Sequence, residues 1–259
     1  MYPIALSIAG SDPSGGAGIQ ADLKTFYRFG VYGQAVVTMV TVQNTLGVKR
    51  VEVLPGDLVR EQICAVVTDI PPAAAKIGAL GNRAVVEAVA ATAESFTFPL
   101  IVDPVMISKS GAAMMDDEAR RVFIDRLLPR AFLLTPNLPE AAELAGFPVR
   151  DWDSMAQAAE KLRSMGAGNV LIKGGHLEGD ALDLLLASDG KYHEFTAPRL
   201  SARHTHGTGC TYSAAIAAGL ALGQDLVNAI RCAKRFVTEA IRTAPGLGSG
   251  SGPLNHFAR

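Results

Sequence analysis

The sequence predicts an α/β fold, a three-layer αβα sandwich built around a mainly parallel central sheet. Short apolar runs alternate along the chain with amphipathic segments of helical periodicity. Several of the runs are apolar throughout, which is typical of parallel strands covered by helices on both faces. The 259 residues, 49% of them hydrophobic, suffice for one large core. Because no internal repeat or charged linker divides the chain, we expect residues 1–259 to form a single domain.

The predicted elements begin in βαβαβ order, which favours a doubly wound arrangement. Strands are predicted at residues 4–9, 35–42, 75–78, 100–103, 132–135 and 170–173, and helices near 17–29, 57–69, 82–95, 117–127, 138–145 and 154–165. The pattern then changes. Residues 181–197 are predicted to form an antiparallel hairpin with an Asp189-Gly190 turn, and helices follow at 208–222 and 225–243. The segment "GLGSGSG" (246–252) is either a loop that closes over a ligand or slack before the terminus.

Composition and charge favour a small-molecule partner. The formal net charge is −1, and no basic run with interleaved aromatic residues is present, so we expect no nucleic-acid partner. The start "MYPIALSIAG" lacks the basic region of a signal peptide, and the most apolar window (212–223) is too short to span a membrane. Three cysteines without CxxC spacing indicate a reducing compartment. We therefore expect a soluble cytoplasmic protein.

The stretch "THGTGCT" places Gly207, Thr208, Gly209 and Cys210 at the start of a predicted helix. Unpaired backbone N–H groups and the helix dipole attract an anion at such a position, so a phosphate is a suitable ligand. The same position lowers the pKa of a thiol, which would make Cys210 a thiolate able to accept a proton. The alternative is a glycine-rich turn whose cysteine packs as a small hydrophobe.

Other motifs follow predicted strands. "GSDPSGGAGIQADLKTF" (10–26) lacks both the GxGxxG and the GxxxxGK[ST] spacing, which disfavours a dinucleotide-binding dehydrogenase and a Walker ATPase. Asp22 lies inside the helix of this motif, where a solvated helix face is the usual explanation. Asp103 and Lys173 end two strands, at the sheet edge where open α/β sheets bind ligands. Asn137 and Glu140 share one face at a helix start, which also fits a capping box.

In this order the motifs resemble the hydroxymethylpyrimidine and phosphomethylpyrimidine kinases of thiamine biosynthesis, which are members of the ribokinase-like superfamily. The resemblance runs from residue 4 to about residue 257 and rests on "GSDPSGGAGIQADLKTF", "TVQNTLGV", "KIGAL", "VDPVMISKSG", "TPNLPEA", "KGGH" and "THGTGC". It implies a ribokinase-like fold, ATP and Mg²⁺ as cofactors, and two successive phosphorylations. These convert 4-amino-5-hydroxymethyl-2-methylpyrimidine to its monophosphate and then to its diphosphate.

The resemblance also implies a role for each motif. Gly207, Gly209 and Cys210 would form the anion hole for the transferred phosphoryl group, with Cys210 where the wider superfamily usually has an aspartate base. Lys173 would contact the ATP phosphates, and Asp103, Asn137 and Glu140 would surround the magnesium and its waters. Thr208 and Lys234 would lie near the nucleotide. The pyrimidine pocket would be lined by Gly10, Ala17, Asp22, Val42 and Gln43, with the Gln43 amide pairing with a ring nitrogen and the exocyclic amine.

Two other functions stay open at this point. A pyridoxal or pyridoxine kinase is the runner-up, because that ring also carries a hydroxymethyl group, and Gln43 argues against it. A catalytically silent regulator is disfavoured by intact Asp103, Lys173 and Cys210. Ala79 in "KIGAL" departs from the methionine often found in the family and puts the fit of the pocket in doubt. We also expect a homodimer.

Overall fold

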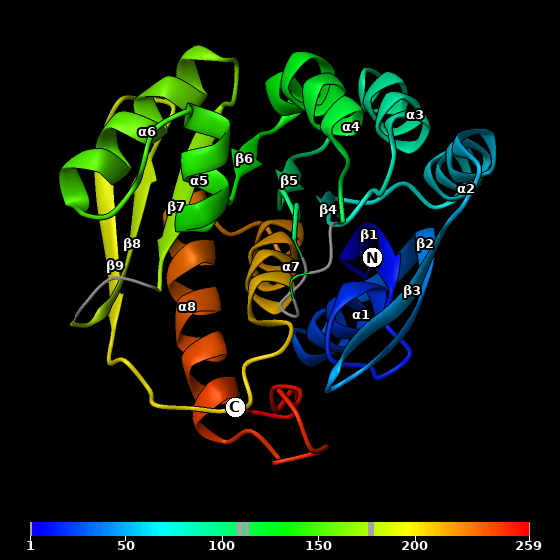
Figure 1. Ribbon diagram of the computed structural model, residues 1–259. Coiled ribbons are helices and arrows are strands. Elements are labelled where there is room, and N and C mark those ends of the chain that lie inside the picture. The colour runs from blue at the N-terminus through cyan, green and yellow to red at the C-terminus, as the bar shows by residue number, and fades with distance from the viewer. Residues whose placement is uncertain (1, 108–110, 112–113, 176–178, 259) are drawn as a thin grey trace.

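A nine-stranded sheet forms the centre of the molecule (Figure 1). The computed structural model describes residues 2–107, 111, 114–175 and 179–258. The strand order is β3-β2-β1-β4-β5-β6-β7-β8-β9. The pairs from β2 to β7 are parallel, and β3, β8 and β9 extend the two edges in antiparallel fashion. The predicted mainly parallel sheet is confirmed.

The strands are β1 (Ile4–Ser11), β2 (Tyr32–Asn44), β3 (Gly47–Val53), β4 (Ala74–Ile77), β5 (Leu100–Val102), β6 (Leu133–Leu134), β7 (Asn169–Gly174), β8 (Ala181–Leu186) and β9 (Tyr192–Ala197). The helices are α1 (Gly18–Arg28), α2 (Gly56–Asp69), α3 (Arg83–Ala93), α4 (Asp117–Val122), α5 (Leu138–Ala145), α6 (Trp152–Ser164), α7 (Thr208–Ala221) and α8 (Leu226–Arg242).

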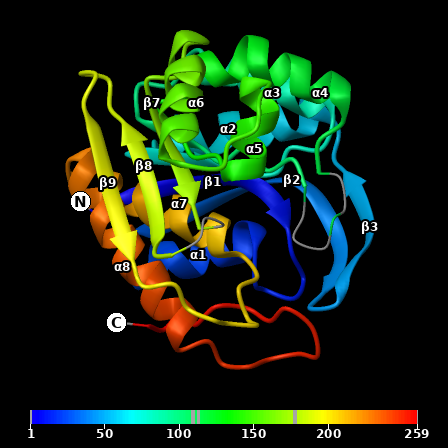
Figure 2. The ribbon, with the colours of Figure 1, turned by 60° about the vertical axis from the view of Figure 1, so that its left-hand side comes forward.

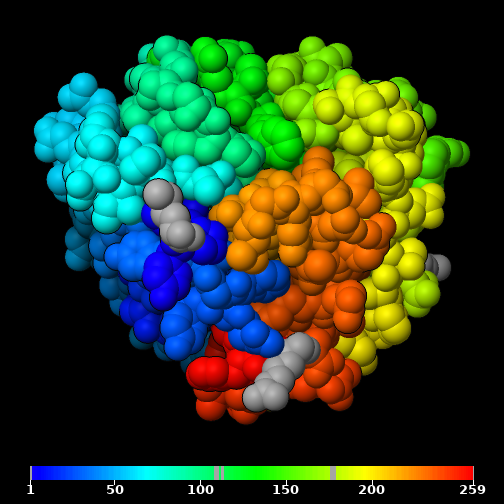
Figure 3. Space-filling view, turned by 180° about the vertical axis from the view of Figure 1, so that it is seen from behind, coloured from blue at the N-terminus to red at the C-terminus, as the bar shows by residue number. Residues whose placement is uncertain are grey.

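Helices cover both faces of the sheet and complete the three layers. One apolar cluster joins α2, α3, α4, α5 and α6 to the first face. A second cluster joins α1, α7 and α8 to the other face, as the turned ribbon in Figure 2 also shows. Seen from behind in Figure 3, α7 and α8 (orange) lie directly beside the N-terminal part of the chain (blue). In the described part of the chain, no helix is long and apolar enough to cross a membrane.

Two elements differ from the sequence prediction. β3 was not predicted, because its polar residues Lys49, Arg50 and Glu52 are exposed on an edge strand that has no continuous apolar run. The predicted helix at 117–127 is shorter as an α-helix. It becomes a π-turn at Phe123–Leu127 and a 3-10 turn at Leu128–Arg130, where Pro129 cannot supply a helical N–H. The predicted hairpin at 181–197 is confirmed as β8 and β9.

The glycine-rich segment 246–252 packs against the turn at Thr45 and against His204. The amide of Ser251 donates to the Thr45 carbonyl at 2.9 Å, and the amide of Gly252 donates to His204 Nδ1 at 3.1 Å. Thr45 belongs to the turn between β2 and β3. The tail therefore joins the far end of the chain to the β2–β3 turn.

Candidate active site

A cavity of about 1090 Å³ opens at the carboxyl edge of the parallel strands, beside the start of α7. Its walls contain almost every site residue that the sequence predicted. These are Gly10, Ala17, Gln43, Asp103, Asn137, Glu140, Lys173, Gly207, Thr208, Gly209, Cys210 and Lys234. Asp22 and Val42 do not line it. Ser108, Lys109 and Ser110 of "VDPVMISKSG" and His176 of "KGGH" lie outside the described residues.

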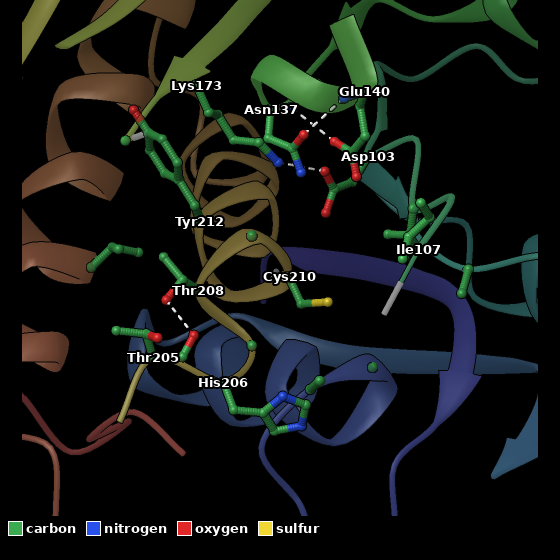
Figure 4. A pocket seen from close by; sticks show the side chains of 18 of the residues that line it. Asp103, Ile107, Asn137, Glu140, Lys173, Thr205, His206, Thr208, Cys210 and Tyr212 are labelled. Carbon is green, nitrogen blue, oxygen red and sulfur yellow. Dashed lines mark hydrogen bonds and ion pairs between the residues drawn. The ribbon is translucent and has the colours of Figure 1, made fainter. Parts of the chain in front are cut away.

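The start of α7 is shaped to accept an anion. Gly207 precedes the helix with φ near +80°, and a Cβ atom there would lie only 1.8 Å from the Gly16 carbonyl oxygen. Only glycine fits both conditions. Gly207 has no side chain to cap the helix, and within the residues that the structure describes only the Thr208 amide has a long 3.4 Å contact to the Thr205 carbonyl, so the amides of Gly209 and Cys210 can bind a ligand. Thr208 Oγ1 donates to the Thr205 carbonyl at 2.8 Å, which fixes the turn (Figure 4).

An ion pair lies opposite this helix start. Lys173 Nζ is 2.6 Å from Asp103 Oδ1 (Figure 4). A Cβ atom at Gly209 would lie 3.4 Å from Lys173 Nζ and 3.5 Å from Asp103 Oδ2, so any side chain at this position would touch the pair. Burial alone would lower the pKa of Lys173, but the Asp103 and Glu140 carboxylates raise it. The lysine is therefore a cation at neutral pH.

The capping box expected for Asn137 and Glu140 is confirmed. Asn137 Oδ1 accepts from the Glu140 amide at 2.9 Å, and Glu140 Oε2 accepts from the Asn137 amide at 2.8 Å, which is a complete capping box at the start of α5. The same two side chains line the cavity. Burial raises the pKa of Glu140 to about 7, with Lys173 opposing the shift and Asp103 adding to it. Two acidic groups thus share one lysine.

Asp22 is not on a solvated helix face, so that interpretation is wrong. Its carboxylate is fully buried, pairs with Lys76 Nζ at 2.9 Å and accepts from Ser7 Oγ at 2.6 Å. Lys76 is buried as well and lies in the cavity wall. Asp22 and Val42, which the family resemblance places at the pyrimidine pocket, are not among the residues that line the cavity. Asp22 pairs with the wall residue Lys76, and Val42 is 52% exposed.

Lys234, which the family resemblance places near the nucleotide, forms an ion pair with Asp183. Its Nζ atom is 2.6 Å from Asp183 Oδ2 and 6.0 Å from the centre of the Tyr212 ring. Burial raises the pKa of Tyr212 well above its ordinary value, and the Asp183 carboxylate raises it further. An aromatic ring and a held cation therefore stand together in the cavity wall, a combination suited to a planar ring beside phosphates.

The comparisons with known proteins decide the family. Residues 12–255 match the model of the phosphomethylpyrimidine kinase family. The chain belongs to this family. The hydroxymethylpyrimidine/phosphomethylpyrimidine kinase of Bacillus subtilis is 46% identical, over 98% of this chain and 94% of the relative. A thiamine biosynthesis bifunctional protein of Geobacter sulfurreducens is 48% identical over 97% of this chain, which spans about half (52%) of that relative.

A pyridoxal kinase is also similar. An ADP complex of Bacillus subtilis pyridoxal kinase superposes with a TM-score of 0.91 at 35% identity, over 100% of this chain and 98% of that one. The ribokinase-like fold expected from the sequence is confirmed. The lower identity does not favour the pyridoxal kinase over the pyrimidine kinases.

One expectation about this phosphomethylpyrimidine kinase family member is wrong. The sequence predicted a lowered pKa for Cys210, but burial raises it. The Lys76 ammonium opposes that rise, while Asp22 and Asp103 add to it, so the helix start does not prevail over burial and two nearby carboxylates. In the absence of substrate, Cys210 is a thiol at neutral pH.

Sequence reasoning about the family's motifs missed two partners in the site, Lys76 and His206. Lys76 stands in "KIGAL" and His206 in "THGTGC", so both were inside the motifs, but no spacing rule points to them. His206 Nε2 is 3.0 Å from Asp12 Oδ2 and 3.0 Å from Gln43 Nε2. These contacts join residues 194 and 163 positions apart, which only the folded chain brings together.

Proposed function

We propose that this protein transfers the γ-phosphoryl group of ATP to 4-amino-5-hydroxymethyl-2-methylpyrimidine and then to the resulting monophosphate. The observation that carries the proposal is that the start of α7 and the Lys173–Asp103 pair lie close together in the wall of one cavity. Phosphoryl transfer is mainly positioning and charge stabilisation, and these groups supply both. The family names of the relatives support the substrate.

The acidic groups fit a magnesium ion. Across the described ranges, no three His, Cys, Asp or Glu side chains are grouped to hold a metal ion by themselves. Mg²⁺ keeps several waters and is often bound through one or two carboxylates together with substrate phosphates. Asp103 and Glu140, which share a single lysine, would hold it. When bound, the ion would neutralise charge on the transferring phosphates.

The proposal assigns the remaining roles as the family resemblance implies them. Lys173 and the amides of Gly209 and Cys210 bind phosphate oxygens, and Thr208 and Lys234 contact the nucleotide. Gln43 pairs with the pyrimidine ring, and Gly10 and Ala17 give the ring close access to backbone. In the view of Figure 4, Cys210 lies between the Asp103–Lys173 pair and His206. In this proposal it contacts the acceptor hydroxyl. The homodimer and the cytoplasmic location also stay proposals, and light scattering of the purified protein tests the first.

One assay tests the reaction itself. Purified protein is incubated with Mg-ATP and either the pyrimidine alcohol or pyridoxal, and the products are identified by mass. We expect the pyrimidine diphosphate, formed through the monophosphate. The pyridoxal kinase similarity makes pyridoxal the relevant competitor. Phosphorylation of pyridoxal alone would replace the proposal with the pyridoxal kinase alternative.

The first mutational prediction concerns Asp103 and Lys173, the two charged side chains proposed to act on the phosphates. Asp103→Asn and Lys173→Ala should each lower turnover by roughly 10²-fold or more, because each removes a fixed charge from the transition state. The matched control is Lys191→Ala, which alters a surface lysine whose side chain is 74% exposed. Turnover and unfolding temperature are measured for all three variants. Near-normal turnover in both site variants would contradict the assignment.

The second mutational prediction concerns Gln43, which is proposed to contact the pyrimidine ring. Gln43→Met removes an amide paired to a ring nitrogen and an amine, and leaving such groups unpaired costs about 1–3 kcal/mol. We expect the kcat/KM for the pyrimidine to fall by roughly 5- to 150-fold, and that for pyridoxal to fall much less. The ratio of the two values is the measurement. Equal losses would show that Gln43 does not read the ring.

A further inference from the structure

Three side chains meet on the pyrimidine side of the cavity. Asp12 Oδ2, His206 Nε2 and Gln43 Nε2 form a chain with two 3.0 Å contacts that share the histidine nitrogen. Asp12 and His206 are 3% and 9% exposed, and all three residues line the cavity. Buried polar groups are almost always hydrogen-bonded, so each of these contacts needs one donor and one acceptor.

The carboxylate decides the state of the histidine. Asp12 Oδ2 already accepts from the amides of Gly16 at 3.1 Å and Ala17 at 2.9 Å. Burial alone would raise the pKa of Asp12, but the hydrogen bonds from His206 and Ser14 lower it to about 2, so the group is an ionised acceptor. Because a carboxylate only accepts, His206 Nε2 must carry a hydrogen. Asp12 Oδ2 and Gln43 both lie 3.0 Å from this nitrogen, so the single hydrogen is shared between them in a bifurcated hydrogen bond. A protonated ring nitrogen cannot accept, so the end of Gln43 beside it has to be an acceptor.

The other end of the amide leads to the same conclusion independently. Thr41 Oγ1 lies 2.9 Å from the Ser11 carbonyl oxygen and 3.3 Å from Gln43 Oε1. A carbonyl oxygen accepts only, and a hydroxyl has one hydrogen, so this hydrogen goes to Ser11 at the shorter distance. Thr41 Oγ1 then offers a lone pair to Gln43. Both neighbours of Gln43 thus require the amide turned by half a turn from the orientation in the structure.

We propose that His206, held by Asp12, is a positioning residue that fixes the Gln43 amide with its oxygen toward His206 and an N–H toward Thr41, and thereby sets the preference for the ring. The inference rests on the proposed function, in which Gln43 reads the pyrimidine. The amide oxygen has two lone pairs and the amide nitrogen has two hydrogens. One lone pair would bond to His206 and one hydrogen to Thr41. The other lone pair and the other hydrogen then form one acceptor beside one donor in a fixed order, complementary to a ring nitrogen beside an amine.

The backbone keeps the His206 ring in this place. A Cβ atom at Gly16 would lie 2.5 Å from His206 Cδ2, so the ring packs directly against a position that must be glycine. The His206 amide donates to the Gly252 carbonyl at 3.1 Å, and residue 206 forms an isolated bridge with Pro253. The ring is thus held between the loop after β1 and the C-terminal tail, which suits a group that orients another one.

A double-mutant cycle tests the proposal. His206→Phe keeps a ring of similar shape and removes the N–H, and is expected to raise the KM for the pyrimidine alcohol about tenfold while kcat changes less than about threefold. In a Gln43→Met background the same change should alter KM less than about twofold. An equal factor in both backgrounds would overturn the proposal while leaving the proposed function intact. An unchanged KM in Gln43→Met alone would overturn the ring-reading role of Gln43 and this proposal with it, whereas the proposed reaction itself fails only if the product assay yields no phosphorylated pyrimidine.

A measurement on the unmodified protein keeps the proposal testable if His206→Phe does not fold. The ¹⁵N chemical shifts of the His206 ring, assigned by their disappearance in His206→Gln, report which nitrogen carries hydrogen. We expect Nε2 to be protonated from pH 6 to pH 8, with or without the pyrimidine. An unprotonated Nε2 in that range would overturn the proposal, because His206 could then accept from Gln43 and would not turn its amide.

Discussion

Cys210 stands at the third position of α7, and the balance between helix dipole and burial decides its chemistry. Burial raises the pKa of its thiol, and Asp22 and Asp103 raise it further against the pull of Lys76. The thiolate fraction therefore grows as pH rises above neutrality. An alcohol must lose its proton when it attacks phosphorus, whereas a phosphate monoester with a second pKa of about 6 is already mostly ionised at pH 7.

This difference gives a pH-dependent prediction. In the wild type, the rate of alcohol phosphorylation should rise with pH above 7, and the rate of monophosphate phosphorylation should not. Cys210→Ala should remove that rise and slow the alcohol step by roughly 10²-fold in the alkaline range. Both rates are measured at saturating Mg-ATP, with Cys210→Ser as the variant that keeps shape. An equal loss in both steps would mean that Cys210 only shapes the anion site.

The positions of some single residues can be predicted from the sequence alone. Glycine at 207, the capping pair Asn137 and Glu140, and the strand-end position of Asp103 follow from local rules, and the structure has each of them where the motif predicts. The solvated position expected for Asp22 was wrong because its partner Lys76 comes from strand β4, 54 positions away. A helical position alone does not show whether an ion pair buries it.

At the scale of elements, the buried Asp22–Lys76 ion pair joins α1 to β4 inside the core. Both side chains have no exposed surface. Burial alone would lower the pKa of Lys76, but the Asp22 carboxylate and the neighbouring acidic groups raise it, so the lysine stays charged. Removing one partner of a buried pair leaves an uncompensated charge, which costs much more than losing a surface pair.

We therefore expect Lys76→Met to lower the free energy of unfolding by about 3–5 kcal/mol, or roughly 10 °C in Tm. The double variant Lys76→Met, Asp22→Leu should recover most of that loss, since no buried charge remains. The matched control is Lys191→Met, which breaks a surface pair of the same 2.9 Å length. Urea denaturation followed by circular dichroism measures all three. A loss in Lys76→Met no larger than in the control would contradict this account.

The elements themselves were predictable where apolar periodicity is strong. The buried parallel strands and the long helices on both faces follow from it, and their order gives the layers. β3 was missed because an edge strand exposes its polar residues and has no buried face to mark it. The break after Val122 was missed because the apolar pattern continues through the π-turn to Leu127.

At the scale of the whole molecule, the side of the cavity that we assign to the pyrimidine is assembled from the two ends of the chain. Asp12 meets His206, and Thr45 meets the tail at Gly250 and Ser251. No periodicity in the sequence encodes such long-range contacts. The sequence alone therefore could not show whether "GLGSGSG" is a loop that closes over a ligand or a flexible segment before the terminus. The tail does pack on the β2–β3 turn, two residues after Gln43.

This packing predicts that a small change in the tail alters the pocket. A Cβ atom at Gly250 would lie 1.9 Å from the Thr45 carbonyl oxygen and 2.5 Å from its carbon, so Gly250→Ala must push the β2–β3 turn away. We expect overpacking to cost about 1–3 kcal/mol of stability and the KM for the pyrimidine alcohol to rise about fivefold, as Gln43 shifts with the turn. The dissociation constant for ADP should stay within about twofold, because Lys173 and Lys234 belong to other elements.

Ser249→Ala is the matched control, since it also changes one small tail residue but its side chain is exposed. Steady-state kinetics give the KM for the pyrimidine, calorimetric titration gives the ADP affinity, and both are compared between the two variants. Gly250→Ala must raise KM well above the control while leaving ADP binding in place. If the two variants share the same KM, the tail closes the molecule without reaching the pocket. If Gly250→Ala weakens ADP and pyrimidine equally, the tail supports the whole site and not the β2–β3 turn in particular.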